Sequence, residues 1–139
     1  MTKHDLVNGL NEDLSAELGT IIRYIVQSSR AHGPHGAEVR DLLSKEVQDE
    51  LGHASFLADV IVDLGGEPTK KPQPFETSET LSDMLSLNIE MEMQDVSDYM
   101  ERASVAAELD NVELKVRLEE MAADEARHAR ELRRLAKGM

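Results

Sequence analysis

The sequence predicts an all-α protein, an up-down-down-up four-helix bundle with one long crossover connection. Apolar residues recur at helical spacing along most of its 139 residues. Clusters of glycine, proline and other turn-forming residues separate four such segments. Aromatic residues make up only 3% of the chain, and no alternating β-branched runs indicate strands. A chain of this length fits one fold, so we expect a single domain over residues 1–139.

The first predicted hairpin spans about residues 3–64. Its first helix carries Glu17 within a stripe of apolar residues that faces the core. A segment rich in glycine, proline and histidine, residues 31–36, then ends this helix. A second helix is expected from about residue 37 to Leu64, before two consecutive glycines. The two apolar stripes consist of Leu6, Leu10, Leu14, Ile21 and Ile25, and of Leu43, Val47, Ala54, Leu57 and Ile61.

A crossover over residues 65–77 follows, in which closely spaced prolines exclude a helix. Fully extended, about 13 residues reach roughly 40 Å, so this segment can cross the length of the bundle. Ser78 is expected to cap a third helix that ends near Ala107. Residues 109–111 then turn the chain into a fourth helix, so the second hairpin spans about residues 78–137.

The most informative feature is a repeated set of residues. Two copies of Asp-Glu-x-x-His, and two copies of Glu followed seven residues later by Tyr, are each separated by 75 positions (for example 125 − 50 and 92 − 17). The first copy consists of Glu17, Tyr24, Glu50 and His53, and the second of Glu92, Tyr99, Glu125 and His128. A Glu from each of two helices, with Glu-x-x-His from each of the other two, is the ligand pattern of a two-metal carboxylate site in a helical bundle. The glutamates and histidines are therefore candidate metal ligands.

The six candidate ligands can meet at one level of the bundle. Within each hairpin, the glutamate of the first helix and that of the second are equally far from the turn between them. Each lies roughly 25 Å from its turn, at about 1.5 Å per helical residue. Glu17, Glu50 and Glu92 also interrupt apolar stripes, where an unpaired buried carboxylate costs several kcal/mol. Glu90 competes with Glu92, but two residues turn it about 200° away, so we expect Glu90 to face solvent.

Composition excludes several kinds of protein. Without cysteine the chain has neither disulfides nor a thiolate site, so oxygen and imidazole must hold any metal. The formal net charge of −13 opposes binding to nucleic acid. No run of about 18 apolar residues is present, and the first residues lack the basic and apolar regions of a secretion signal. We expect a cytoplasmic protein with no nucleic-acid or membrane partner.

The candidate ligands and their surroundings resemble the ferritin-like di-iron carboxylate superfamily, which includes bacterioferritins and rubrerythrins. The residues Leu10-Asn11-Glu12, Leu14, Glu17-Leu18, Ile21 and Tyr24 are similar to the first bacterioferritin helix, and Asp124-Glu125-Ala126-Arg127-His128 is similar to the fourth. The resemblance covers the whole bundle. It implies oxidation of Fe²⁺ by O₂ or H₂O₂ in iron storage or detoxification, by a homo-oligomer between a dimer and a cage in size.

The resemblance also implies a role for each ligand around two iron ions. Terminal carboxylates would be Glu17 and Glu92, bridging carboxylates Glu50 and Glu125, and imidazole ligands His53 and His128. Residues three apart on a helix project from one face, which agrees with these roles. Hard carboxylates with one imidazole per ion suit iron or manganese, and zinc would also bind.

Four further residues are expected to act on the site. Asp49 and Asp124 point partly sideways, and we expect each to hydrogen-bond the outer nitrogen of the opposite histidine. Tyr24 and Tyr99 lie two turns beyond the terminal glutamates. There they would be catalytic, either by hydrogen-bonding the bridging carboxylates or by supplying electrons. Alternatively they fill the core and satisfy their hydroxyl groups.

Other positions depart from the family pattern or extend it. Bacterioferritins place a haem-binding methionine directly after the second-helix glutamate, where this chain has Leu51, so haem is not expected. Rubrerythrins add a carboxylate one turn after the third-helix glutamate, and this chain has Asp95 there. His32 and His35, in the first turn, are polar loop residues, or else serve ion access or subunit contacts.

Two alternative functions stay open. One is a non-storage, rubrerythrin-like di-iron peroxidase or oxidase that works as a dimer. The other is a non-catalytic helical module whose acidic core binds zinc or calcium structurally, or binds a partner.

Overall fold

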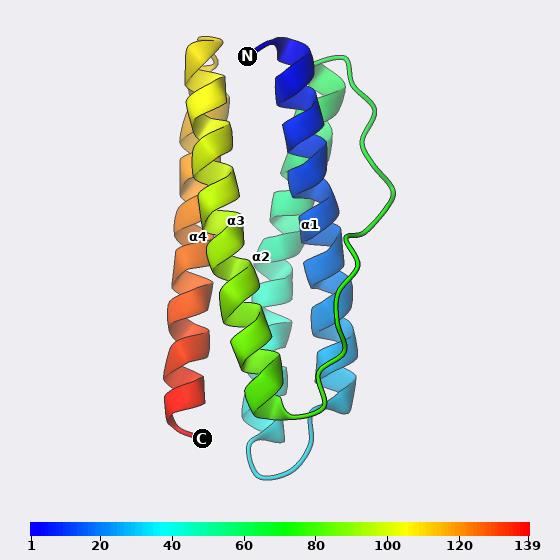
Figure 1. Ribbon diagram of the computed structural model, residues 1–139, viewed down its shortest axis with the longest axis vertical. Coiled ribbons are helices and arrows are strands. Elements are labelled where there is room, and N and C mark those ends of the chain that lie inside the picture. Colours follow the sequence, from blue (N-terminus) through cyan, green and yellow to red (C-terminus); the bar gives the residue numbers. More distant parts are fainter.

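Four α-helices and no strands make up the protein, which confirms the predicted fold class. The computed structural model describes residues 1–139. The helices are α1 (Lys3–Arg30), α2 (Gly36–Asp63), α3 (Leu81–Glu108) and α4 (Val112–Lys137). In Figure 1, α1 and α2 run in opposite directions, the crossover returns along the outside of α1, and α3 and α4 again run in opposite directions. The helix order is therefore up-down-down-up.

The charged residues divide the core into two parts. α1 packs mainly on α2 and α3 mainly on α4, and the two pairs meet through α1 with α3 and α2 with α4. The larger apolar cluster contains Leu10, Leu57 and Leu118, and the smaller one contains Leu43 and Leu85. A belt of buried glutamate and histidine side chains lies between them. None of the helices has a stretch long and apolar enough to cross a lipid bilayer.

Side chains cap three helices at their N-termini. Thr2 and Asp5 form a reciprocal capping box at the start of α1. Asn111 caps α4 by accepting a backbone N–H in its first turn. The prediction that Ser78 caps the third helix is wrong, because Thr80 Oγ1 accepts the Asp83 N–H and α3 begins directly after Thr80. Serine and threonine are both favoured N-cap residues, so residue type alone did not distinguish the two positions.

One residue of the predicted core stripe of α1 lies on the surface. Ile25 is 59% exposed, whereas Tyr24 is completely buried. Each step of four residues turns about 40° beyond a full helical turn, so two such steps from Glu17 leave the core face. The inward position therefore passes to Tyr24.

The crossover, residues 64–80, is held on α1. The side chain of Asn11 hydrogen-bonds two backbone groups of this segment. The Gln73 N–H donates to the Ser15 carbonyl over 2.9 Å. Gly19 permits this close approach, because a Cβ there would lie 2.6 Å from the Gln73 carbonyl oxygen. The crossover thus forms a fixed wall beside the α1–α3 seam.

Candidate metal centre

The six predicted ligands converge between the two apolar clusters. They are Glu17 of α1, Glu50 and His53 of α2, Glu92 of α3, and Glu125 and His128 of α4. All six are buried, and the four carboxylates have 0% exposure. Antiparallel pairing within each hairpin places the glutamates at the same level, because they are equally far from the turn.

One group of ligand atoms surrounds His53. Its Nδ1 lies 3.8 Å from Glu17 Oε1, 3.7 Å from Glu50 Oε1 and 3.3 Å from Glu125 Oε1. The ligand atoms of this group all lie within 4.8 Å of one another. Two atoms bound at about 2.1 Å to one small divalent ion are roughly 3 Å or more apart, so the group has the size of one ion's ligand shell.

A second group surrounds His128. Its Nδ1 lies 3.2 Å from Glu50 Oε1, 3.6 Å from Glu92 Oε2 and 3.4 Å from Glu125 Oε1. These ligand atoms also lie within 4.8 Å of one another. Glu50 and Glu125 belong to both groups, whereas each of the other residues belongs to one. The arrangement has the connectivity of two ion positions that share two carboxylates.

Each imidazole is oriented by an aspartate, as the sequence predicts. His53 Nε2 donates to Asp124 over 2.9 Å, and His128 Nε2 donates to Asp49 over 2.8 Å. An ionised carboxylate can only accept, so Nε2 carries a hydrogen, and Nδ1 presents its lone pair to the centre once it has released its own proton. Arg127 lies 3.0 Å from Asp49 and 3.6 Å from Asp124. Burial opposes ionisation of Asp49, but hydrogen bonds from His128 and Arg127 outweigh it and lower the pKa of Asp49.

The atoms that face the centre have no hydrogen-bond partner in the protein. They are Glu17 Oε2, Glu92 Oε2, both oxygens of Glu50 and of Glu125, and Nδ1 of His53 and His128. A buried polar atom without a partner costs free energy, and folded proteins contain few of them. Here they gather at one point, and once deprotonated they present only acceptors. Such a set of oxygen and imidazole donors fits two small divalent cations.

The buried carboxylates also disturb one another's ionisation. Burial, followed by the charge of Glu50, raises the pKa of Glu17 well above its usual value. Burial and the charges of Glu17 and Glu50 do the same to the pKa of Glu125. Burial alone would lower the pKa of His128, but the carboxylates of Glu50 and Glu92, 3.2 and 3.6 Å from its Nδ1, outweigh burial and raise that pKa to about 12. Cations that bind here therefore displace protons and relieve carboxylate repulsion.

The two tyrosines reach the site, but not at the carboxylates that the sequence analysis expected. Tyr24 O–H donates to Glu92 over 2.6 Å, and Tyr99 O–H donates to Glu17. Each tyrosine therefore donates to a glutamate that belongs to only one of the two ligand groups. Neither donates to Glu50 or Glu125, which belong to both groups. The reason is that α1 and α3 are antiparallel, so a tyrosine two turns beyond one glutamate lies opposite the other.

Sequence reasoning missed Glu46, a buried carboxylate one turn before Glu50. Both oxygens of Glu46 are buried without a hydrogen-bond partner. Burial raises the pKa of Glu46 to about 8, against the opposing charge of His128, so the group holds a proton at neutral pH. The available signal was its place between Leu43 and Glu50 on the inward stripe of α2, at helical spacing.

The remaining candidate residues have different positions. Asp95 is 8% exposed, and burial together with the charges of Glu17 and Glu92 raises the pKa of Asp95 well above its usual value. Glu90 is exposed, as predicted. His32 and His35 lie in the α1–α2 turn at one end of the bundle, and the structure does not bring them to the centre.

Comparison with known proteins agrees with this architecture. The family model described as Ferritin-like domain matches residues 7–139. The solved structure of ferritin-like, diiron-carboxylate proteins from Bacillus anthracis strain Ames is similar, with 37% identity and a TM-score of 0.94 over 98% of this chain and 99% of that chain.

Two further solved structures extend the likeness. A bacterioferritin from Mycobacterium tuberculosis has 25% identity and a TM-score of 0.81, over 93% of this chain and 82% of that chain. A dodecameric thioferritin from Bacteroides fragilis has 21% identity and shares the fold, with a TM-score of 0.89 over 99% of this chain and 88% of that chain. No curated protein matches the sequence.

Proposed function

The chain belongs to the ferritin-like family, and on that basis we propose that it is a di-iron ferroxidase that oxidises Fe²⁺ with O₂ or H₂O₂ in iron storage or detoxification. The observation that carries the proposal is the convergence of buried, unpartnered ligand atoms in two groups. In this proposal the terminal ligands are Glu17 and Glu92, the bridging ligands Glu50 and Glu125, and the imidazole ligands His53 and His128. Manganese and zinc are alternative ions for the same donors.

Ferrous ions are the substrate, and each of two ions loses one electron. With O₂ the products are two ferric ions and one H₂O₂, and with H₂O₂ they are two ferric ions and two waters; either reaction takes up two protons. The four carboxylates neutralise two ferrous ions and hold them side by side. Glu46 holds a proton at neutral pH one turn from Glu50, which supports a role as proton donor.

Tyr24 and Tyr99 are proposed as catalytic residues that hold the terminal carboxylates and can supply an electron. Each is buried, with its hydroxyl hydrogen directed to a carboxylate oxygen. Loss of an electron from a tyrosine is coupled to loss of its proton, and the carboxylate is placed to accept that proton.

A non-storage di-iron peroxidase or oxidase is the second candidate function. Asp95 favours it, because a buried carboxylate near Glu17 and Glu92 extends the acidic set beyond six ligands. The two candidates share the centre and differ in the fate of ferric iron.

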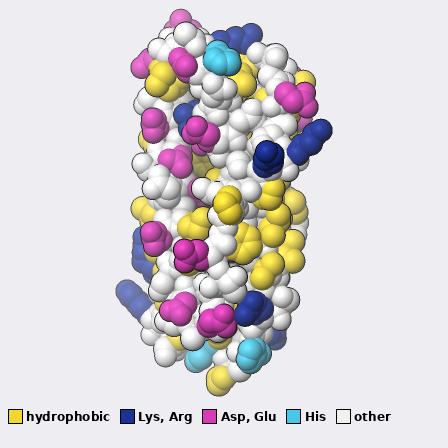
Figure 2. All heavy atoms as spheres, turned by 45° about the vertical axis from the view of Figure 1, so that its right-hand side comes forward, with side chains coloured by type: hydrophobic (Ala, Val, Ile, Leu, Met, Phe, Trp, Pro, Cys, Tyr) yellow, Lys and Arg dark blue, Asp and Glu magenta, His cyan; other side chains and the backbone are white.

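We propose a homo-oligomer as the working form. Large apolar side chains are exposed on α1 and α2, among them Ile22, Ile25 and Leu51. Figure 2 shows hydrophobic side chains gathered at mid-height on one face of the molecule. A contiguous apolar patch of this kind is typical of a protein–protein interface.

The test is to add excess Fe²⁺ in air, desalt the protein and count the iron retained per chain. Tens of ions would indicate a mineral-storing assembly, and about two would indicate a di-iron enzyme without storage, the capacity of one two-metal site. Near zero, with no oxygen consumed, would overturn the metal assignment. Glu92→Gln should abolish rapid oxidation, whereas the matched variant Glu90→Gln removes an exposed carboxylate two residues away and should not.

A further inference from the structure

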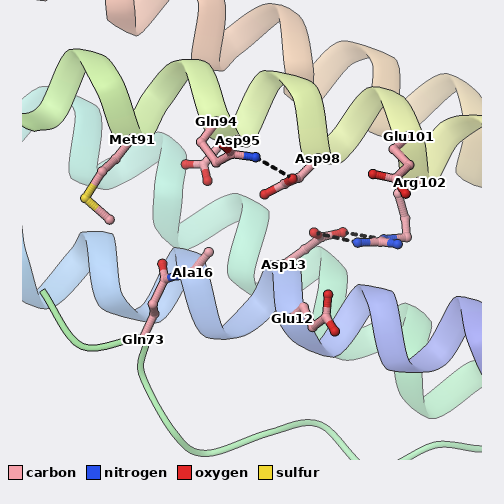
Figure 3. A pocket seen from close by; sticks show the side chains of 10 residues that line it. All are labelled: Glu12, Asp13, Ala16, Gln73, Met91, Gln94, Asp95, Asp98, Glu101 and Arg102. Atoms are coloured by element: carbon pink, nitrogen blue, oxygen red, sulfur yellow. Dashed lines mark hydrogen bonds and ion pairs between the residues drawn. The ribbon is translucent and has the colours of Figure 1, made fainter.

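A pocket of about 380 Å³ opens between α1 and α3. Figure 3 shows side chains of both helices pointing into it, with Gln73 of the crossover at one side. Its acidic lining residues are Glu12, Asp13, Asp95, Asp98 and Glu101. Asp13 is engaged by Arg102, whose Nε donates over 2.9 Å. Asp98 accepts only from the Gln94 amide, over 2.9 Å, which leaves its other oxygen free for a ligand.

Asp95 distinguishes this pocket from an ordinary acidic surface. Asp95 is only 8% exposed and lines the pocket. No N–H group of the protein donates to its carboxylate, and its hydrogen-bonding neighbour is the carboxyl group of Glu125. Asp95 lies one helical turn after the ligand Glu92 on α3 and also lines the pocket, so it stands between the pocket and the metal centre. A buried carboxylate without a donor is costly unless a cation or a proton accompanies it.

The internal repeat supplies a comparison within the same molecule. Shifting each acidic lining residue by 75 positions gives its counterpart at the other end of the α1–α3 seam. The counterparts of Glu12, Asp13, Asp95, Asp98 and Glu101 are Leu87, Asn88, Thr20, Arg23 and Val26. None of them is acidic, and one is a cation. The two copies of the repeat therefore supply equivalent metal ligands, but the residues around those ligands are acidic at one end of the α1–α3 seam and include a cation at the other.

Arg23 closes that second end. Its side chain is 1% exposed and is held by Asn88 and Thr20, at 3.0 and 3.3 Å. Its guanidinium carbon lies 5.2 Å from the centre of the Tyr24 ring. A fixed buried cation repels an approaching metal ion, whereas a pocket lined by carboxylates concentrates cations and raises their rate of arrival.

We propose that the α1–α3 pocket is a third divalent-cation site, held by the carboxylates of Asp95 and Asp98, from which Fe²⁺ passes to the buried centre. Carboxylate oxygens suit a hard divalent ion, and the volume leaves room for the waters that such an ion retains. Binding in the pocket stands by itself, whereas passage of Fe²⁺ rests on the proposed function. Both ions of the centre are then loaded from one end of the seam.

Binding is tested with Mn²⁺. The bound ions are counted from the decrease in the electron paramagnetic resonance signal of free Mn²⁺, in 0.15 M salt because this ionic strength screens weak binding to surface charges. The wild-type chain should bind about two ions in the centre and one more weakly in the pocket. The double variant Asp95→Asn with Asp98→Asn should lose only the weaker ion, and Glu17→Gln should lose binding in the centre but keep the weaker ion. Glu90→Gln, on the same helix but outside the pocket, should match the wild type. A wild-type chain without the weaker ion, or a double variant that keeps it, would overturn the site.

Passage is tested by rapid-mixing measurement of Fe²⁺ oxidation. Asp98→Asn should raise the Fe²⁺ concentration for half-maximal rate by roughly tenfold, with an unchanged maximal rate, because one carboxylate–cation contact in the pocket is lost. An unchanged Fe²⁺ dependence would overturn passage through the pocket. If the wild type oxidises no iron, the proposed function fails, and the Mn²⁺ count still decides whether the pocket binds a cation.

Discussion

At the scale of single residues, each histidine of the centre is oriented by an aspartate from the other hairpin. His53 of α2 is held by Asp124 of α4, and His128 of α4 by Asp49 of α2. These hydrogen bonds fix which ring nitrogen faces the centre and also join the hairpins. The two aspartate side chains are only partly buried, and their hydrogen bonds make each imidazole a stronger base toward a metal ion.

Asp124→Ala is expected to weaken metal binding by about 10–100-fold, the range for losing an outer partner of a ligating histidine. Without the carboxylate, the His53 ring can rotate and either nitrogen can carry the hydrogen. The measurement is a Co²⁺ titration followed by its absorption spectrum. Asp59→Ala, which removes an exposed aspartate of α2, serves as the control. Unchanged affinity in Asp124→Ala would remove the orienting role.

Tyr24→Phe separates a polar role from core filling. Phenylalanine fills nearly the same volume, but it leaves Glu92 Oε1 without the hydrogen bond that it now accepts over 2.6 Å. We expect the variant to lose about 1–3 kcal/mol of unfolding free energy in chelator, the cost of an unsatisfied buried acceptor. Urea unfolding measures it. A variant as stable as the wild type would mean that the ring serves mainly as core volume.

The sequence predicts the convergence of Glu17, Glu50 and their repeat counterparts because matched spacing carries through regular antiparallel helices to position. It does not predict the partner of Tyr24, which depends on how α1 lies against α3. Nor does it indicate Arg23, because an arginine among apolar residues usually extends to solvent. Its burial is made possible by Thr20 and Asn88, and such three-residue networks depend on tertiary contacts.

At the scale of elements, α1 carries both a ligand and the support for the crossover. The predicted helix bounds agree with the structure to within a few residues, because glycine, proline and turn residues mark them clearly. The third helix is the exception, since its first turn is selected by the Thr80 hydrogen bond among several possible caps. The crossover path along α1 rests on Asn11, Ser15 and Gly19, none of which has a pattern visible in sequence.

Gly19→Ala and Gly52→Ala are expected to change stability in opposite directions. Alanine in place of a helical glycine gains about 0.5–1 kcal/mol from helix propensity. At Gly52 nothing lies within 4 Å of the new Cβ, so that gain should appear in full. At Gly19 the Cβ would lie 2.6 Å from the Gln73 carbonyl oxygen, and overpacking of this kind costs about 1–3 kcal/mol.

The measurement is urea unfolding of both variants in the presence of a chelator. The slope of unfolding free energy against urea concentration should be the same in both, which checks that their unfolded states are comparable. Stabilisation by Gly19→Ala to the same extent as Gly52→Ala would mean that the crossover moves away from α1 at little cost. In that case Gln73 would not be a fixed wall of the α1–α3 pocket.

At the scale of the whole molecule, a belt of charge separates two apolar clusters, so the stability of the bundle depends on what neutralises the belt. In the metal-free protein, protons do so. The pKa of Glu17 and of Glu125 is raised in the folded state, so the folded chain keeps protons that the unfolded chain releases. The pKa of His128 is raised from 6.5 to about 12, which acts with the same sign. These contributions are present at low pH and are lost as pH rises.

The unfolding free energy of the chelated protein should therefore fall between about pH 5 and pH 9, by up to about 1.4 kcal/mol per pH unit for each group that only the folded chain keeps protonated. Bound cations replace these protons, so the stabilisation by Mn²⁺ should increase over the same range. Urea unfolding at several pH values, with and without Mn²⁺, measures both.

General charge repulsion in a chain of net charge −13 would also lower the unfolding free energy as pH rises, so two variants separate the two causes. Glu125→Gln should flatten the pH dependence, whereas Glu90→Gln, which removes the same charge at the surface, should leave it nearly unchanged. If both variants flattened it equally, the dependence would come from net charge and not from the buried belt.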